Sequence, residues 1–371
     1  MKVIVAITAS AMCLGCGRFE FDADPTRLAD AARATDAPPL AALVCDATTI
    51  QIPAVQAGAE LAVYRSSRGF DAFWASGGPV TGVALDSQLV AAAPAHQVIA
   101  EAATGVAGFI DTGAKVLAVT TTPGGGQALW SLTVDLASPG KLREERSLAG
   151  REPFASDQAQ TPRIWVRGTA AAIVGAYIHD DGSLDKDGSI PTGGPVTSMS
   201  MEDGPDHSHV TWTEDLGAGK SRCLASDIRY MMPSPPTPNG GQQLSDDCHD
   251  VRTSSGPNFA DSMIVVWQTA AHLVEARYLA STGDIMRDMS LHGRKPKVRF
   301  DGTEFWIAWI DEAAGDQLHL ASFDLSGNVK DVALPGWQAT GDEGFQLVRR
   351  GAAVYLVILS ADTLSFLRTC V

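Results

Sequence analysis

From about Ala42 to the end of the chain, apolar residues gather in short runs that clusters of Gly, Pro, Asp and Ser separate. Runs of this kind, rich in β-branched and aromatic residues and bounded by turn residues, are typical of β-strands. Examples are AELAVYRS, QALWSLTVDL, SMIVVWQTA and FWIAWIDE. No amphipathic stretch reaches the length of a helix of about 12 residues. We therefore predict an all-β fold.

The runs repeat at a regular interval. When the apolar run before each polar turn is aligned, one position recurs at Trp74, Thr120, Tyr177, Trp212, Trp267, Trp309 and about Leu359. The intervals range from 35 to 57 residues and average roughly 47. A period of about 40–50 residues with several strands per unit indicates propeller blades. The shortest interval contains DDGSLDKDGSI, which is too polar for full strands and predicts one irregular blade.

The clearest unit spans KPKVRFDGTEFWIAWIDEAAGDQLHLASFDLSGNVKDVALPG. Its marked positions are Phe300, Asp301, Gly302 and Trp309, followed by Phe323, Asp324 and Gly327. This pattern resembles the propeller repeats of many secreted and lipid-anchored bacterial proteins. The resemblance implies architecture only, because propeller repeats carry unrelated functions.

The ends of the repeat region predict how the ring closes. The last unit, from residue 344, contains three strands, and residues 43–52 form a spare strand at the front. Propellers often use such a strand to complete the last blade, which removes an exposed edge. We predict a β-propeller over residues 42–371; seven blades fit best, and six or eight stay open.

Trp306 and Trp309 raise the question of an aromatic binding platform. On a strand they point to opposite faces, and both faces of this run are apolar. A strand between two neighbouring blades has this character, so we predict that both side chains lie in the core between blades.

The N-terminus carries the most specific signal. Lys2 precedes an apolar run that is too short to span a bilayer but fits a signal peptide, which we place at residues 1–15. The ending Cys13-Leu14-Gly15-Cys16 resembles the lipobox of bacterial lipoproteins. That resemblance implies lipid attachment at Cys16, and Gly17 implies the outer membrane, on its periplasmic or cell-surface side. Cys13 departs from the usual aliphatic residue, and an ordinary secretory signal cut elsewhere is the alternative.

Residues 16–41 are rich in Ala, Asp and Pro and predict a flexible linker. After the signal peptide and Cys16, four cysteines remain, which permit three disulfide pairings in an exported chain. The simplest joins Cys45 to Cys370 and Cys223 to Cys248, while free thiols stay open.

Charge excludes one class of partner. The chain has 28 Lys and Arg against 43 Asp and Glu, a net charge of −15, without a long basic run. Binding to nucleic acid is therefore not expected.

Candidate chemistry begins with the histidines. Five polar residues fall in neighbouring blades and can therefore converge into one cluster: His179, Asp180, His207, His209 and His249. His-x-His before a strand is not a specific metal motif, and solvated loops are the simpler interpretation, so we predict no metal and no cofactor. DDGSLDKDGS resembles the start of a calcium loop, but Gly194 stands where a bidentate Glu is required, which favours a plain acidic hairpin.

No motif identifies an enzyme. Acidic residues are plentiful, including Asp180, Glu214, Asp311 and Glu312, but most of them lie at strand-to-turn junctions expected to be solvated. A Gly-x-Ser-x-Gly elbow is lacking. The leading hypothesis is a lipid-anchored, non-catalytic binding or scaffold module that engages protein or glycan at the cell envelope. The alternative is a propeller hydrolase or lyase acting on polysaccharide, which should cluster carboxylates or histidines at the mouth of the central channel.

Overall fold

Antiparallel β-strands account for the regular structure of the part of the chain that the structure describes. The computed structural model describes residues 43–66, 68–111, 115–133, 135–145, 154–156, 164–179, 181, 183–203, 207–229, 237–238, 241–256, 262–279, 285–324 and 328–370. The predicted signal peptide (1–15), the linker (16–41) with Cys16, and Asp180 lie outside the described residues. The described part of the chain contains no helix long and apolar enough to cross a membrane.

The strands form seven sheets, called blades and numbered along the chain. Blade 1 holds β2 (Glu60–Arg65), β3 (Gly69–Ala75), β4 (Pro79–Asp86) and β5 (His96–Ala102). Blade 2 holds β6 (Gly105–Asp111), β7 (Lys115–Thr121), β8 (Gln127–Thr133) and β9 (Gly140–Glu145). Blade 3 holds β10 (Phe154–Ser156), β11 (Ile164–Gly168), β12 (Ala172–Ile178) and β13 (Leu184–Pro191). Blade 4 holds β14 (Val196–Asp203), β15 (His207–Gly217), β16 (Lys220–Arg229), β17 (Thr237–Pro238) and β18 (Gln242–Ser245).

Three more blades complete the set. Blade 5 holds β19 (His249–Ser255), β20 (Met263–Gln268), β21 (Leu273–Leu279) and β22 (Ile285–His292). Blade 6 holds β23 (Arg294–Phe300), β24 (Glu304–Asp311), β25 (Gln317–Asp324) and β26 (Val329–Ala333). Blade 7 holds β27 (Phe345–Arg350), β28 (Ala353–Leu359) and β29 (Thr363–Thr369), together with β1 (Val44–Gln51) from the other end of the chain.

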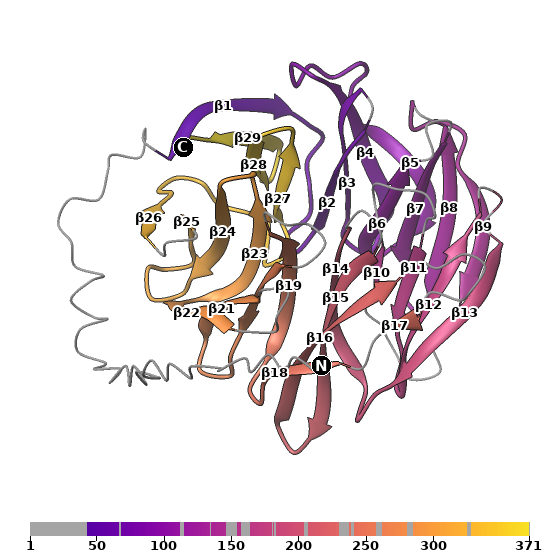
Figure 1. Ribbon diagram of the computed structural model, residues 1–371. Helices are drawn as coiled ribbons and strands as arrows, with labels where there is room; N and C mark the ends of the chain where they lie inside the picture. Colours follow the sequence, from indigo (N-terminus) through magenta and orange to yellow (C-terminus); the bar gives the residue numbers. More distant parts are fainter. Residues whose placement is uncertain are drawn as a thin grey trace, which may run out of the picture. The chain divides into compact units, whose positions relative to one another are not determined.

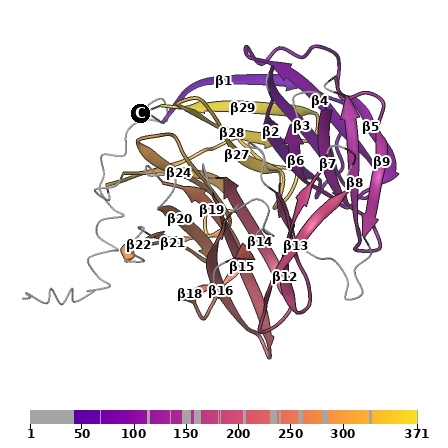
Figure 2. The ribbon, with the colours of Figure 1, turned by 45° about the vertical axis from the view of Figure 1, so that its right-hand side comes forward.

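The first strand of each blade lies at the centre of a closed ring. Contacts run from β2 to β6, β10, β14, β19, β23 and β27, and then from β27 back to β2. The blades fan out around these inner strands (Figures 1 and 2). The chain therefore forms a seven-bladed β-propeller, which confirms the predicted fold and excludes six or eight blades.

The seam of the ring is in blade 7. Its strand order is β1-β29-β28-β27, so the N-terminal strand is the outermost one, as predicted. β1 pairs antiparallel with β29, with Thr48 opposite Phe366. Cys45 and Cys370 form a disulfide across this seam, with their Cα atoms 5.3 Å apart. The bridge joins the two ends of the ring covalently.

The core lies between adjacent blades rather than within one sheet. Trp306, Ala308 and Ile310 pack against blade 7, while Phe305, Ile307 and Trp309 pack against blade 5. Both tryptophans are almost fully buried. The prediction that they belong to the core between blades is therefore confirmed.

The recurring sequence position has a structural meaning. Six of the seven aligned residues, from Trp74 to Leu359, lie in the second strand of their blade, whereas Tyr177 lies in β12, the third strand of blade 3. The prediction that DDGSLDKDGSI is too polar for full strands is wrong, because Leu184–Pro191 forms the complete strand β13 paired with β12. β13 is the outermost strand of blade 3, where water can solvate side chains such as Asp185.

Candidate functional site

The two ends of the ring are chemically distinct. Each blade is an antiparallel meander, so all seven inner strands run in the same direction. We call the end where they begin the proximal end and the end where they finish the distal end. Loops that follow the second strand of a blade return to the proximal end, and loops that follow the first strand lie at the distal end.

Five charged side chains meet near the proximal end, and we call them the axial charge network. They are Asp250 and Arg252 in β19, Lys295 and Lys297 in β23, and Glu343 just before β27. Lys297 Nζ donates to Glu343 Oε2 at 2.5 Å. Lys295 Nζ lies 3.1 Å from both Glu343 Oε1 and Asp250 Oδ2. Arg252 pairs with Asp250 and lies 3.6 Å from Glu343 Oε2.

Burial strengthens these ion pairs. The Lys297 side chain is 9% exposed and that of Glu343 is 27% exposed. Burial alone would raise the pKa of Glu343, but Lys297, Arg252 and Lys295 together hold it far below its ordinary value. Burial and the nearby Arg252 guanidinium lower the pKa of Lys297, and the attraction of Glu343 does not fully offset them. Glu343 therefore remains ionised at any physiological pH.

A serine from blade 4 holds the network in place. Ser198 Oγ in β14 accepts hydrogen bonds from the Val251 N–H at 3.1 Å and from Arg252 Nη1 at 3.2 Å. The same hydroxyl lies 3.4 Å from Asp250 Oδ1, to which it can donate. Blades 4, 5, 6 and 7 are thus linked through polar contacts of their inner strands.

A further basic residue at this end is also neutralised. Arg294, the first residue of β23, donates to Asp316 at 2.6 Å, to Asp342 at 2.9 Å and to Glu312 at 3.0 Å. Burial would lower the pKa of Arg294, but the bonds to Asp316 and Asp342 raise it. Three carboxylates thereby share one guanidinium.

The acidic residues singled out from the sequence have basic partners where the structure describes them. Glu214 is a buried carboxylate that accepts from Arg222 Nε and from the Trp212 indole, both at 2.9 Å. Its side chain is 2% exposed, so Glu214 is an exception to the solvated positions expected for most of these acidic residues. Arg222 makes this burial possible because it neutralises the charge. Asp311 lies 3.6 Å from His319 Nε2.

The predicted histidine cluster is spread over several strands. His179 is exposed at the end of β12, and His249 begins β19, where its Nε2 lies 3.9 Å from Asp247. His209 is buried in β15, the second strand of blade 4. The backbone of His207 begins β15, but its side chain is outside the described part, as is Asp180. Among described residues, no three His, Cys, Asp or Glu side chains gather as a metal site requires.

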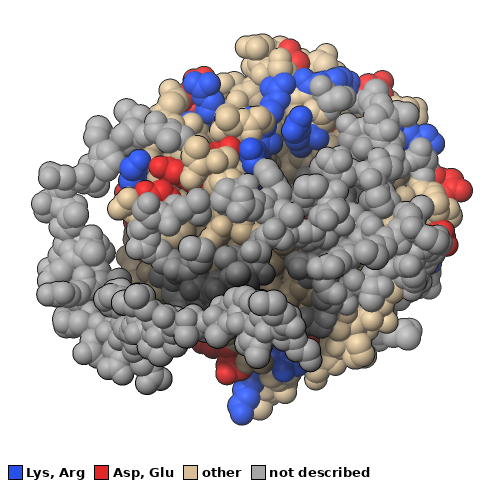
Figure 3. All heavy atoms as spheres, in the orientation of Figure 1, with Lys and Arg blue, Asp and Glu red and all other residues tan. Residues whose placement is uncertain are grey.

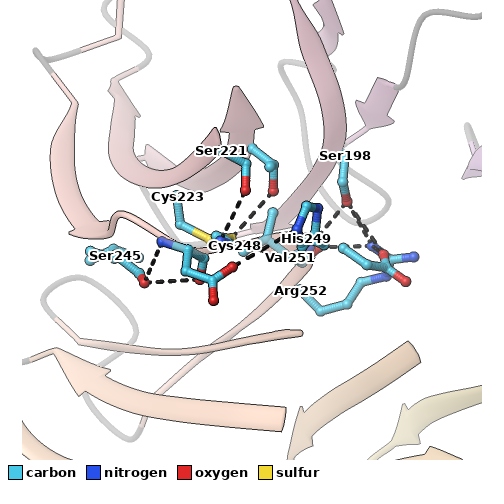
Figure 4. The surroundings of a disulfide bond; sticks show 12 residues. Ser198, Ser221, Cys223, Ser245, Cys248, His249, Val251 and Arg252 are labelled. Carbon is cyan, nitrogen blue, oxygen red and sulfur yellow. Dashed lines mark hydrogen bonds and ion pairs between the residues drawn. A yellow bond between two sulfur atoms is a disulfide. The ribbon is translucent and has the colours of Figure 1, made fainter. Parts of the chain in front are cut away.

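The Cys223–Cys248 disulfide lies beside the axial charge network (Figure 4). It joins β16 of blade 4 to the segment that leads into β19 of blade 5, with Cα atoms 5.5 Å apart. Ser221 Oγ accepts a hydrogen bond from the Cys248 N–H at 3.1 Å. Both predicted disulfide pairs are therefore present, and this buried one fixes the start of the strand that carries Asp250 and Arg252.

Glu343 is poorly suited to act as the general acid of a glycoside hydrolase. Such an enzyme needs one carboxylic acid with a raised pKa and a second carboxylate facing it. Glu343 instead has a lowered pKa and is surrounded by three cations. A carboxylate held in this way neither donates a proton nor approaches a sugar carbon freely.

Sequence reasoning missed the axial charge network. Its members lie far apart in the chain and meet only when blades 5, 6 and 7 close the ring. One available signal was RKPKVRF, where charged residues alternate within the first strand of a blade. Charges at such positions face the ring axis or a neighbouring blade and therefore require partners.

Comparisons with known proteins agree on the fold. No protein-family model matches the chain, and no curated protein matches it. The β-propeller domain of Myceliophteria thermophila Cps50 (Swd1) has a TM-score of 0.55 at 9% identity, covering 88% of this chain and 100% of that one. The BP39L lectin from Burkholderia pseudomallei has a TM-score of 0.53 at 12% identity, covering 74% and 84%. Virginiamycin B lyase from Staphylococcus aureus has a TM-score of 0.52 at 10% identity, covering 88% and 99%. At these identities the likeness shows the fold alone.

Proposed function

We propose that this chain is an exported, lipid-anchored β-propeller that acts as a non-catalytic binding module at the cell envelope, with a glycan or an envelope protein as its ligand. The observation that carries the proposal is the neutralisation of Glu343 by Lys297, Lys295 and Arg252. The carboxylates near the ring axis are held in structural ion pairs, so the loops and the rims of the ring remain for ligand binding.

Two disulfides support export. Disulfides persist in oxidising compartments and are rare in the cytosol. The Cys45–Cys370 bridge holds the seam, so oxidation completes the ring. The lipid anchor rests on the lipobox-like sequence that ends at Cys16, and in this proposal a linker separates the propeller from the outer membrane.

The anchor is tested by Cys16→Ser. A single sulfur carries the lipid, so the variant should move from the membrane fraction to the soluble fraction after cell lysis. Cys13→Ser is the matched control and should stay with the membrane. Membrane retention of the Cys16→Ser chain would contradict the anchor.

The absence of catalysis is tested separately. The protein is incubated with neutral and acidic polysaccharides, and new reducing ends and unsaturated sugar products are measured over time. We expect polysaccharides to be recovered at their original length. Chain shortening that Glu343→Gln abolishes would establish the hydrolase or lyase alternative instead.

A further inference from the structure

The distal end of the ring carries arginines that the proximal network does not use. Arg65 ends β2, Arg68 lies in the following turn, and Arg349 and Arg350 end β27. We call these four residues the arginine patch. β2 and β27 are neighbours, joined by a hydrogen bond of 2.6 Å from the Val63 N–H to Gln346 Oε1. The arginines follow this bond by only a few residues on each strand. Because strands advance about 3.3 Å per residue, the arginines of both strands lie at similar distances from the bond, toward the distal end.

Contacts with uncharged groups hold part of the patch in place. Arg350 Nη1 donates to the Ser87 carbonyl at 2.9 Å, and its guanidinium lies 5.7 Å from the centre of the Phe70 ring. Arg349 Nε donates to the Gly351 carbonyl at 2.8 Å. Carbonyls and rings orient a guanidinium without cancelling its charge. The positive charge of Arg350 therefore remains available to a ligand.

The basic residues at the two ends of the ring differ in their partners. There, Arg252, Lys295 and Arg294 all have carboxylate partners at close range. In the patch, Arg68 lies 3.9 Å from the buried carboxylate of Asp71, and Arg65 is exposed. Figure 3 shows Lys and Arg gathered on the upper part of one face, where Figure 1 places β1, β2 and β27–β29. A chain of net charge −15 thus has a local basic surface.

The chemistry of the patch fits planar anionic groups. A guanidinium donates two parallel hydrogen bonds to a carboxylate, which a lysine does not. The half-buried Tyr355 ring lies 5.2 Å from Phe70, so an aromatic surface adjoins the arginines. Sugar acids present carboxylates on a ring that can lie against such a surface.

A small ligand suits the patch better than a membrane surface. Charges are screened over about 8 Å at physiological ionic strength, so a short oligosaccharide experiences mainly the arginines. A flat anionic membrane would also face the acidic remainder of the chain and be repelled.

We infer that the arginine patch binds an acidic glycan through its carboxylate groups. This inference rests on the proposed function, since it names the ligand class of the binding module. Arg350 would hold one carboxylate between blades 7 and 1 at the distal end, and Arg65 would hold a neighbouring one.

Binding is measured by calorimetry with the full chain carrying Cys16→Ser, so that a lipid cannot contribute. The probe is a galacturonate oligosaccharide, and its neutral methyl ester is the matched ligand. We expect Arg65→Gln and Arg350→Gln each to weaken binding roughly tenfold and to reduce its salt dependence. Lys220→Gln, which removes the same charge from an exposed hairpin at the proximal end, should leave the affinity unchanged.

The inference would be overturned if the acidic probe did not bind, or if the methyl ester bound equally well. It would also be overturned if Lys220→Gln lost as much affinity as the arginine variants, or if the protein bound phosphatidylglycerol vesicles in place of the oligosaccharide. Each of these results leaves the non-catalytic proposal standing. Shortening of the oligosaccharide during the measurement would instead contradict the proposed function.

Discussion

Replacing Glu343 with glutamine would leave Lys297, Lys295 and Arg252 near one another without their shared carboxylate. Removing one partner of a buried ion pair costs about 3–5 kcal/mol, and the 27% exposure of Glu343 favours the lower figure. We expect Glu343→Gln to lower the free energy of unfolding by about 3 kcal/mol in urea titrations.

An exposed ion pair provides the control. Glu101 pairs with Lys141 and has a side chain that is 54% exposed. Glu101→Gln should cost less than about 1 kcal/mol, because water screens such pairs. Equal losses in the two variants would show that the axial charge network contributes no more than a surface pair.

The lowered pKa of Glu343 also predicts a pH dependence. A carboxyl whose pKa is depressed by folding stabilises the chain fully above its unfolded pKa, about 4.3, and loses that contribution as pH falls through the folded pKa. Between about pH 5 and pH 2, the wild-type chain should therefore lose stability more steeply than Glu343→Gln. Unfolding free energies of both chains, measured across this pH range, test the prediction. Equal changes of unfolding free energy with pH in the two chains would contradict it.

At the scale of the element, the hairpin between β23 and β24 depends on Asp301. Its Oδ1 accepts from the Thr303 N–H at 2.6 Å and the Glu304 N–H at 2.8 Å, and its Oδ2 accepts from the Trp306 indole at 2.8 Å. Burial would raise the pKa of Asp301, but these bonds lower it. Gly302 completes the turn with a φ of 123°, which favours glycine.

We expect Asp301→Ala to destabilise the chain by about 3 kcal/mol, because several donors lose a charged acceptor. Asp324 is a matched control in the hairpin between β25 and β26: it accepts from the Asn328 N–H at 2.8 Å and from Asn328 Nδ2 at 2.6 Å, but it is more exposed. Asp324→Ala should cost about 1 kcal/mol. Thermal and urea unfolding measure both, and the reverse order would refute the role assigned to Asp301.

Strands with an apolar face were predictable, whereas the polar outer strand β13 was not. Trp306 and Trp309 could be placed between blades because both faces of their strand are apolar. β13 has few apolar residues because it lies at the outside of blade 3, so hydrophobic periodicity missed it. Backbone hydrogen bonds pair β13 with β12, and the amino-acid composition of a segment does not predict such bonds.

At the scale of the molecule, the period of about 47 residues predicted the ring, and the spare strand at residues 43–52 predicted its seam. The contacts between Lys297 and Glu343, or between Arg350 and Phe70, could not be predicted in the same way. They join different blades, so they depend on how many blades close the ring and how each is tilted. A repeat in the sequence predicts the blades but not the side-chain contacts between them.

The seam leads to a prediction about the whole ring. β1 is mostly exposed, so its pairing with β29 and the Cys45–Cys370 disulfide hold it in place. In the variant Cys45→Ser with Cys370→Ser, β1 should separate from blade 7 more often. Hydrogen exchange of its backbone amides should then rise at least about tenfold, while β20 and β24 in the core remain protected.

Because the freed edge of β29 can pair with another chain, the variant should also self-associate more readily. Cys223→Ala with Cys248→Ala is the control, since that bridge closes a span of only 25 residues within blades 4 and 5. Unchanged exchange of β1 in the seam variant would show that strand pairing alone closes the ring.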